Sequence, residues 1–265
     1  MTRLLNAAGA LIGGLLLTQT ALANDWLNVD DFENHQEGQR VDAIRNWTKL
    51  SNFAPGTVVK DGENRVAQIG PGEAICTRVG SSKLTIPEGA TGIIYLRFRT
   101  LTDSRYWGGV FGLSGRKPTN ESDLNVGWSL GTPDKSRPNA TFTVLSHGKK
   151  DILVNYRGRM NKAYEDLGPE IKPGVWYDLW VTIDNSRDEI RTFIQGGDFV
   201  KRTELSHFRN ADQKTFQFQT ASASDLSHFV IMNPTEGTNY NPRTIQVDNI
   251  NFIVESAPSA VAAGH

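Results

Sequence analysis

Aromatic and acidic residues alternate with apolar ones in the segment 176–184, a spacing that could bring them to one surface. Trp176, Asp178 and Trp180 occupy every second position, and Tyr, Leu and Val residues stand between and after them. Period-two alternation is typical of a β-strand with one buried face. On the other face, indole rings can stack on a sugar ring while a carboxylate accepts its hydroxyl groups. The segment therefore indicates a sugar-handling surface, whether the sugar is held or cleaved.

The segment 91–100 shows the same alternation with a different set of polar residues. Tyr95, Arg97 and Arg99 share one face, and the residues between them are apolar. One interpretation is a groove floor on which guanidinium groups bind carboxylates or sulfates. The other is a solvated outer face, on which long polar side chains protect against aggregation. We favour the groove because the segment 176–184 has the same pattern.

Three further residues could contact or act on a ligand. Trp107 stands beside glycines in an expected loop, and we expect it to contact the ligand. His147, in an expected turn, could serve as a base, although a solvated loop residue is the commoner case. Tyr156 ends an expected strand, where its phenol could exchange a proton. Trp47 and Trp128 alternate with strand residues and are expected in the core.

Strands dominate the sequence, and we predict an all-β fold, a two-sheet antiparallel jelly-roll sandwich. Turn residues such as Asp61-Gly62 separate many short alternating segments. The clearest expected strands are 91–100, 176–184, 190–195 and 244–254. At most a short helix is allowed at 202–208 or 160–165, because no segment keeps a helical period.

The first residues predict export. Residues 1–23 combine Arg3, an apolar run and an Ala-Leu-Ala cleavage site, which is the pattern of a signal peptide and too short for a membrane span. We expect a secreted or periplasmic protein with one sandwich domain over 24–254 and a flexible tail over 255–265. The net charge of −1 gives no reason to expect nucleic acid as a partner. The single cysteine, Cys76, is expected to be buried and without a disulfide partner.

Carboxylates near both ends of the expected domain suggest a metal. Asp31 and Glu33 lie in an early strand and Asp248 in the last one, and such strands run close together in a jelly roll. Carboxylates and carbonyls are the ligands that calcium prefers, so a structural calcium is favoured over simple surface acids. No spacing typical of a zinc site and no G-x-S-x-G nucleophile motif is present in the sequence.

The order of these motifs resembles one superfamily. An Asp-Phe-Glu start, the strand YLRFR, the strand GVWYDLWVTIDN, a Gly-Gly turn and a VDNINF end resemble the concanavalin A-like (laminin G-like) jelly rolls of exported bacterial proteins. This resemblance covers nearly the whole mature chain and implies a carbohydrate-binding or carbohydrate-active protein. By resemblance to carbohydrate-binding jelly-roll modules, Glu33 and Asp248 would hold the calcium.

The superfamily contains proteins of several functions, so alternatives stay open. The first is a protein that binds a polysaccharide or oligosaccharide, with acidic sugars as one option, on the face that carries Arg99, Trp176, Asp178 and Trp180. The second is a polysaccharide lyase that performs β-elimination on a uronate polymer. There Arg97 would neutralise the carboxylate and Tyr95, Tyr156 or His147 would transfer the proton. The Gln-Ile-His segment of alginate lyases is missing. A glycoside hydrolase needs two carboxylates, and Asp178 has no partner that the sequence identifies. An adhesion domain is a further alternative.

Overall fold

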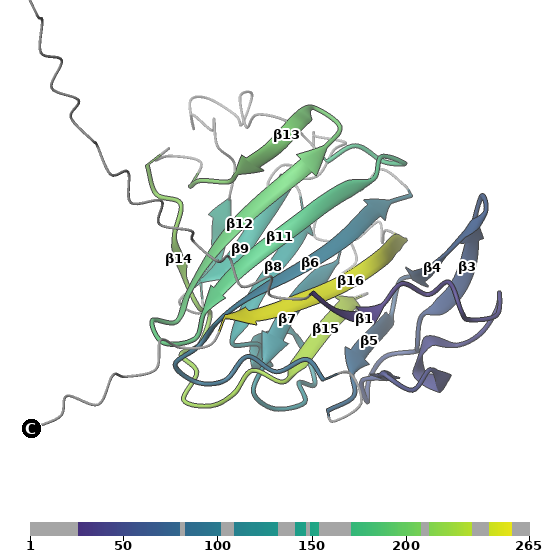
Figure 1. Cartoon of the computed structure of the whole chain (residues 1–265), viewed down its shortest axis with the longest axis horizontal. Helices are drawn as coiled ribbons and strands as arrows, with labels where there is room; N and C mark the ends of the chain where they lie inside the picture. Colours follow the sequence, from purple (N-terminus) through teal and green to yellow (C-terminus); the bar gives the residue numbers. More distant parts are fainter. Residues whose placement is uncertain are drawn as a thin grey trace, which may run out of the picture.

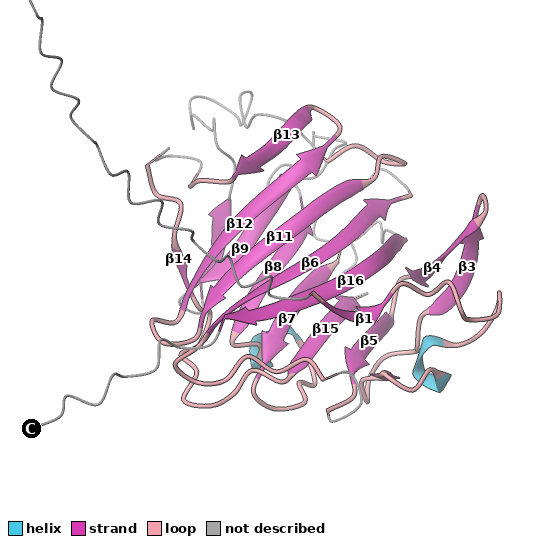
Figure 2. Cartoon of the chain, in the orientation of Figure 1, coloured by secondary structure: helices cyan, strands magenta, loops and turns pink. Residues whose placement is uncertain are grey.

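The regular secondary structure of the described residues is almost entirely β-strand (Figure 2). The structure is a computed structural model that describes residues 26–79, 83–101, 109–131, 141–146, 149–153, 171–207, 212–234 and 244–255, with residues 131, 141–146 and 149–153 described in their backbone only. The strands are β1 (Leu27–Asp30), β2 (Trp47–Thr48), β3 (Thr57–Asp61), β4 (Asn64–Ile69), β5 (Glu73–Thr77), β6 (Thr91–Thr100), β7 (Val110–Ser114), β8 (Val126–Gly131), β9 (Thr141–Ser146), β10 (Lys149–Leu153), β11 (Tyr177–Asp184), β12 (Glu189–Gly196), β13 (Phe199–Glu204), β14 (Phe216–Gln217), β15 (His228–Asn233) and β16 (Ile245–Glu255). Two single-turn 3-10 helices, η1 (Val41–Ala43) and η2 (Glu121–Asp123), lie in connections.

These strands form two stacked antiparallel sheets (Figure 1). The first has the order β13-β12-β11-β6-β16-β4-β3, with β14 beside β12 and β1 beside β16. The second has the order β10-β9-β8-β7-β15-β5-β2. Strands far apart in the sequence are neighbours in each sheet, which is the connectivity of a jelly roll rather than a meander. The predicted two-sheet antiparallel sandwich is confirmed.

The core between the sheets explains the alternation of the sequence. In β6 and in β11 every second side chain is buried, and Leu96, Phe98 and Leu179 have no exposed surface. Phe98 of the first sheet contacts Phe111 of the second, with ring centroids 5.7 Å apart. A fully buried side chain of this size contributes about 1.5–3 kcal/mol to folding, which fixes the inward face of each strand. The opposite face of β6 and β11 is therefore free to carry a site.

The expected core tryptophans and the cysteine are buried as predicted. Trp47 and Trp128 have no exposed surface, and Cys76 is likewise buried. The Trp47 indole nitrogen donates to Asp30 at 2.8 Å, which satisfies its only polar atom. The short helix that the sequence allowed at 202–208 does not begin at Arg202, because Arg202 lies in β13, the edge strand beside β12.

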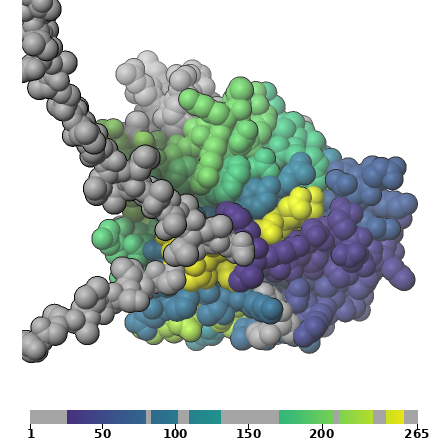
Figure 3. Space-filling view, in the orientation of Figure 1, coloured from purple at the N-terminus to yellow at the C-terminus, as the bar shows by residue number. Residues whose placement is uncertain are grey.

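The first and last described strands lie side by side. In β1, Asn28 pairs with Asn251 of β16, and the purple amino-terminal residues adjoin the yellow strand in Figures 1 and 3. β16 also pairs with β6, and the register shifts between Asp248 and Asn251. This β-bulge adds one residue to β16, and Asn249 within it has a φ of 50°.

The sandwich accounts for the described part of the chain between Trp26 and Glu255. The predicted signal peptide and all but the first residue of the predicted tail lie outside the described residues, so both stay predictions. Among the described residues, no helix has the length and apolar character needed to cross a membrane.

Candidate functional site

The strand register brings the two polar segments together on one face of the first sheet. β11 pairs with β6 so that Trp180 lies opposite Tyr95 and Asp178 opposite Arg97. β16 flanks β6 on the other side and places Asp248 next to Arg97. Because residues that face each other across a ladder point to the same side, they form one surface. The sequence predicted the two halves of this surface, and the register joins them.

We call this surface the concave face. Its described residues are Trp26, Tyr95, Arg97, Arg99, Trp176, Asp178, Trp180, Phe193, Gln195, Gln246, Asp248 and Asn251. The hairpin β3–β4 at one edge curls over it, because Asp61 at the end of β3 binds both Arg99 and Trp176. Three strands separate β3 from β11, so in a flat sheet they would lie about 19 Å apart. The contact therefore requires the strong curvature that makes this face hollow.

A cavity of about 460 Å³ lies on the concave face, within the range of about 300–1,000 Å³ that is usual for ligand sites. It is lined by Trp26, Tyr95, Asp178, Trp180, Gln195 and Asn251. The tyrosine ring is packed between the two tryptophans, with its centroid 6.2 Å from that of Trp26 and 5.3 Å from that of Trp180. The cavity thus offers aromatic surface together with a carboxylate and two amides, of which Asn251 lies beside Tyr95 and Gln195 beside Asp178.

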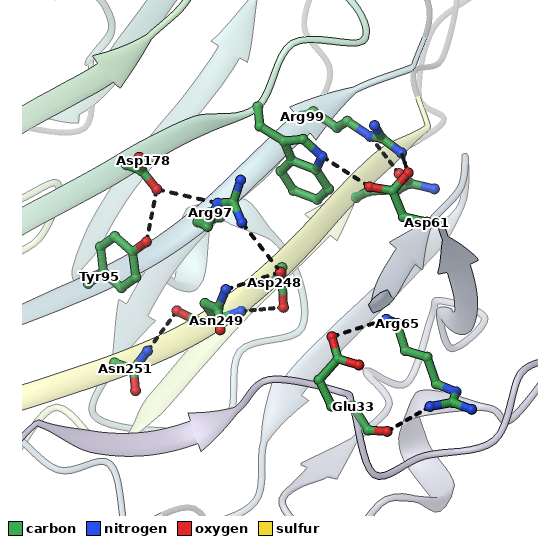
Figure 4. Close-up of polar contacts among 12 residues, drawn as sticks. Glu33, Asp61, Arg65, Tyr95, Arg97, Arg99, Asp178, Asp248, Asn249 and Asn251 are labelled. Carbon is green, nitrogen blue, oxygen red and sulfur yellow. Dashed lines mark hydrogen bonds and ion pairs between the residues drawn. The ribbon is translucent and has the colours of Figure 1, made fainter. Parts of the chain in front are cut away.

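Arg97 lies between two carboxylates at the centre of the face (Figure 4). Its Nε is 3.4 Å from Asp178 Oδ1, and its Nη1 is 3.9 Å from Asp248 Oδ2. Tyr95 donates to the same oxygen of Asp178 at 2.8 Å. Burial, together with this hydrogen bond, raises the pKa of Tyr95 well above its usual value, so the phenol stays protonated at neutral pH.

Asp248 differs from Asp178 in its surroundings. Its side chain is 4% exposed, against 34% for Asp178. Burial raises the pKa of Asp248 to about 6, and the negative charges of Glu33 and Asp31 act in the same direction. Its oxygens accept hydrogen bonds from the backbone and the side chain of Asn249.

A second polar cluster lies on the part of the concave face next to the β3–β4 hairpin. Arg99 Nη2 lies 2.6 Å from Asp61, and its Nε donates to Gln246 at 2.7 Å. The guanidinium groups of Arg97 and Arg99 lie 5.2 and 4.7 Å from the centroid of the Trp176 ring. These cation–π contacts hold the indole in place but cover part of the surface that we expected to stack on a sugar. The aromatic surface of the cavity comes instead from Trp26, Tyr95 and Trp180.

The expected metal ligands do not share a site in the described residues. Glu33 accepts from the backbone nitrogen of Arg65 at 3.2 Å, and Figure 4 shows it turned toward Arg65. Both oxygens of Asp248 have donors, as described above. Among the described residues, no three His, Cys, Asp or Glu side chains are grouped so that they could hold a metal ion. As they stand, these residues do not fit a calcium site, and calcium stays a prediction.

Three of the predicted site residues, Trp107, His147 and Tyr156, lie outside the described residues. Conversely, several residues of the concave face were missed by the sequence analysis. Trp26 precedes the first strand and belongs to no alternating pattern, and Asn251 is placed by the bulge in β16. Gln195 could have been found from the alternation of β12, because it stands opposite Asp178.

Comparison with known proteins gives relatives only at the level of the fold. No family model and no curated sequence matches the chain. Among solved structures, a GH131 β-glucanase catalytic domain from Podospora anserina aligns with a TM-score of 0.52 at 9% identity, over 88% of this chain and 97% of that one. The catalytic domain of a glycoside hydrolase family 131 protein from Coprinopsis cinerea aligns with a TM-score of 0.50 at 8% identity, over 86% and 93%.

The peanut lectin also aligns, with a TM-score of 0.47 at 10% identity, over 82% of this chain and 95% of that one. At these identities the likeness concerns the fold and leaves the function to be argued from the site. The two antiparallel sheets and the alignments with the two GH131 domains agree with the predicted resemblance at the level of the fold: the chain has the concanavalin A-like jelly-roll fold.

Proposed function

We propose that the protein binds a polysaccharide or oligosaccharide on its concave face. The observation that carries this proposal is the cavity lined by the aromatic side chains Trp26, Tyr95 and Trp180 together with Asp178, Gln195 and Asn251. A sugar ring has an apolar face and a rim of hydroxyl groups, so it fits a site that offers both aromatic surface and hydrogen-bonding groups.

The concave face continues beyond this cavity, which supports a chain rather than a single sugar as the ligand. A second cavity of about 390 Å³ is lined by Thr182 and Asp184, which follow Trp180 at alternate positions of β11. From Asp178 to Asp184 the strand extends about 20 Å, at about 3.3 Å per residue. A ligand that fills both cavities must therefore be elongated along β11.

The proposal is tested by retention of the protein on immobilised polysaccharides, acidic and neutral, with isothermal titration on those that retain it. Reducing ends and the ultraviolet absorbance of unsaturated uronates are followed in the same mixtures. Binding without either product supports the proposal. The variant Asn251→Ala should weaken binding, whereas Asn64→Ala, in the exposed turn of the β3–β4 hairpin, is the matched control. Failure of every polysaccharide to bind would overturn it.

Glycoside hydrolysis is a second candidate, because the structure offers the partner carboxylate that Asp178 lacked in the sequence. Asp178 and Asp248 flank Arg97 from β11 and β16, strands about 10 Å apart on either side of β6. Inverting glycosidases separate their two carboxyl groups by about 6.5–9.5 Å. The raised pKa of Asp248 suits a proton donor, and Asp178 is the more exposed carboxylate.

This candidate has its own test. Release of reducing ends by the wild type, and its loss in both Asp178→Asn and Asp248→Asn while binding persists, would support hydrolysis. Reducing ends that still form in either variant would exclude this pair.

The predicted lyase is not supported by the described part of the site. Arg97, expected to neutralise a uronate, is already paired with two carboxylates. Tyr95 donates a hydrogen bond to Asp178, and its raised pKa keeps the phenol protonated, so little phenolate is present to act as a base. The absorbance measurement above tests this alternative directly.

Calcium and export also remain proposals. The described contacts of Glu33 and Asp248 do not form a calcium site, so calcium needs a direct test. Added calcium should then raise the melting temperature and a chelator should lower it. Asp248 cannot be a calcium ligand and a proton donor at the same time. Hydrolysis that persists in chelator would therefore favour the role of proton donor.

Export is tested by sequencing the amino terminus of the secreted protein, which we expect at Asn24.

A further inference from the structure

The concave face and its rim carry four arginines, and their surroundings differ in one respect. Arg97 pairs with two aspartates, Arg99 pairs with Asp61 and Gln246, and Arg191, opposite Thr182, pairs with Glu204. Among the described residues, Arg202 has neither a carboxylate nor an amide partner: its guanidinium lies 4.7 Å from the ring centroid of Trp180 and 4.7 Å from that of Phe193. Three of these four positive charges thus have a carboxylate partner in the described part of the chain, and that of Arg202 does not.

Arg202 lies next to the cavity on the concave face. Thr203 of β13 pairs with Ile194 of β12, so Arg202 lies one residue from that pair, in the direction of Gln195. Gln195 and Trp180 both line the cavity, and Arg202 lies over the Trp180 ring. Because β13 is the edge strand of its sheet, the guanidinium stands at the rim of the concave face and is exposed.

A contact with aromatic rings engages the face of a guanidinium and does not use its N–H groups. Those groups lie in the guanidinium plane, where they match the two oxygens of a carboxylate or sulfate. Two rings at equal distance also restrict the side chain, so less rotational entropy is lost when an anion binds. At the cavity itself, the partly exposed Asp178 would repel an anion and favours hydroxyl groups.

We propose that Arg202 recognises an anionic substituent, the carboxylate of a uronic acid or a sulfate ester, on the glycan that binds the concave face, and thereby selects acidic polysaccharides. The inference rests on the proposed function. In this proposal the residue that selects acidic sugars is Arg202, rather than Arg97 or Arg99. Arg202 lies in β13, where the sequence analysis allowed at most a short helix.

Matched pairs of polymers test this inference. Titration of the wild type, Arg202→Gln, Arg202→Lys and Lys201→Gln would use polygalacturonate and alginate against their carboxyl-reduced forms, and heparin against its desulfated form. The first pairs report a carboxylate and the last a sulfate. Lys201→Gln is the control, since it removes the same charge from the adjacent, likewise exposed position of β13.

We expect the wild type to prefer one of the unmodified polymers over its modified form. Arg202→Gln should lose about tenfold or more in affinity for that polymer while binding the form that lacks the carboxylate or the sulfate unchanged. Arg202→Lys should lose most of the preference, because an ammonium lacks the planar pair of donors. Lys201→Gln should behave as the wild type. Thermal melting of each variant shows that it is folded.

Two results would overturn the inference while leaving the proposed function intact. One is a wild type that binds each unmodified polymer and its modified form equally, and the other is an Arg202→Gln variant that keeps the preference. A wild type that binds none of the six polymers and no other polysaccharide would overturn both.

Discussion

The indole nitrogen of Trp176 donates a hydrogen bond of 3.1 Å to Asp61, although the two residues are 115 positions apart in the sequence. Asp61 ends β3, and Trp176 immediately precedes β11, four places away in the sheet order. This contact, together with the ion pair from Arg99 to the same carboxylate, joins the edge hairpin to the centre of the sheet. It maintains the hollow shape on which the cavity depends.

Asp61→Ala should therefore reduce both stability and glycan binding. The substitution removes one charged hydrogen bond from Arg99 and one from Trp176, and we expect it to lower the free energy of unfolding by about 1.5–3 kcal/mol. Urea unfolding measures the loss. Asp198→Ala is the control, because its pair with Lys172 is about half exposed and should contribute only about 0–1 kcal/mol. Equal effects of the two substitutions would contradict a role for Asp61 in the curvature.

Asp248 should make stability depend on pH. Its pKa is raised from 3.8 to about 6 in the folded protein, mainly by burial. The folded state therefore binds the proton more tightly than the unfolded chain, so this group adds stability as the pH falls from about 6 to about 4 and loses that contribution as the pH rises again. Asp248→Asn removes the buried charge, and at pH 8 it should be more stable than the wild type by about 1–3 kcal/mol.

Urea unfolding of both proteins between pH 4 and pH 8, with chelator throughout, measures this difference. The gap between variant and wild type should narrow toward pH 4. A variant that is less stable than the wild type at pH 8 would show that the contacts of the carboxylate with Arg97 and Asn249 outweigh its burial.

Trp26→Ala should weaken glycan binding without changing stability. The side chain is 44% exposed and precedes β1, so its loss should alter the free energy of unfolding by no more than about 0.5 kcal/mol. Because it forms one wall of the cavity, we expect several-fold weaker binding in titration. Leu27→Ala serves as control, since Leu27 is 45% exposed but does not line the cavity. Wild-type affinity in Trp26→Ala would remove this residue from the site.

Cys76 should be inert in the folded protein. Burial raises the pKa of its thiol to about 12, and the thiolate is the reactive form. Ellman's reagent at pH 8 should therefore react with less than one thiol per chain over hours, and with one after unfolding in guanidinium. Rapid reaction of the native protein would show that β5, which carries Cys76 between β15 and β2, readily separates from its neighbours.

The side chains that β6 and β11 contribute to the concave face could be predicted from the sequence. Period-two alternation in β6 and β11 separates the buried residues from Tyr95, Arg97, Asp178 and Trp180, and the structure keeps that separation. The reason is local: a one-residue slip would expose the whole apolar set, so the hydrophobic pattern specifies which side chains face outward.

The same reasoning failed at the bulge in β16 and at the edge strand β13. In β16, Ile245 and Val247 are buried, but beyond the bulge the buried residues are Ile250 and Phe252, so the phase changes and Asn251 joins Asp248 on the concave face. β13 shows no clear alternation, because an edge strand has one side in solvent. The sequence therefore did not reveal this strand, and a short helix was allowed from Arg202 onward.

By itself, the sequence determined the all-β class, the core faces of the long strands and the kinds of side chain available for a ligand, since each follows from residues close together in the chain. The tertiary structure alone decided which of these side chains meet. It paired Arg97 with Asp178 and Asp248, brought Asp61 across to Trp176 and placed Arg202 at the rim, with no carboxylate partner among the described residues. Strand order, curvature and the bulge set these contacts, and all three depend on packing between segments far apart in the sequence.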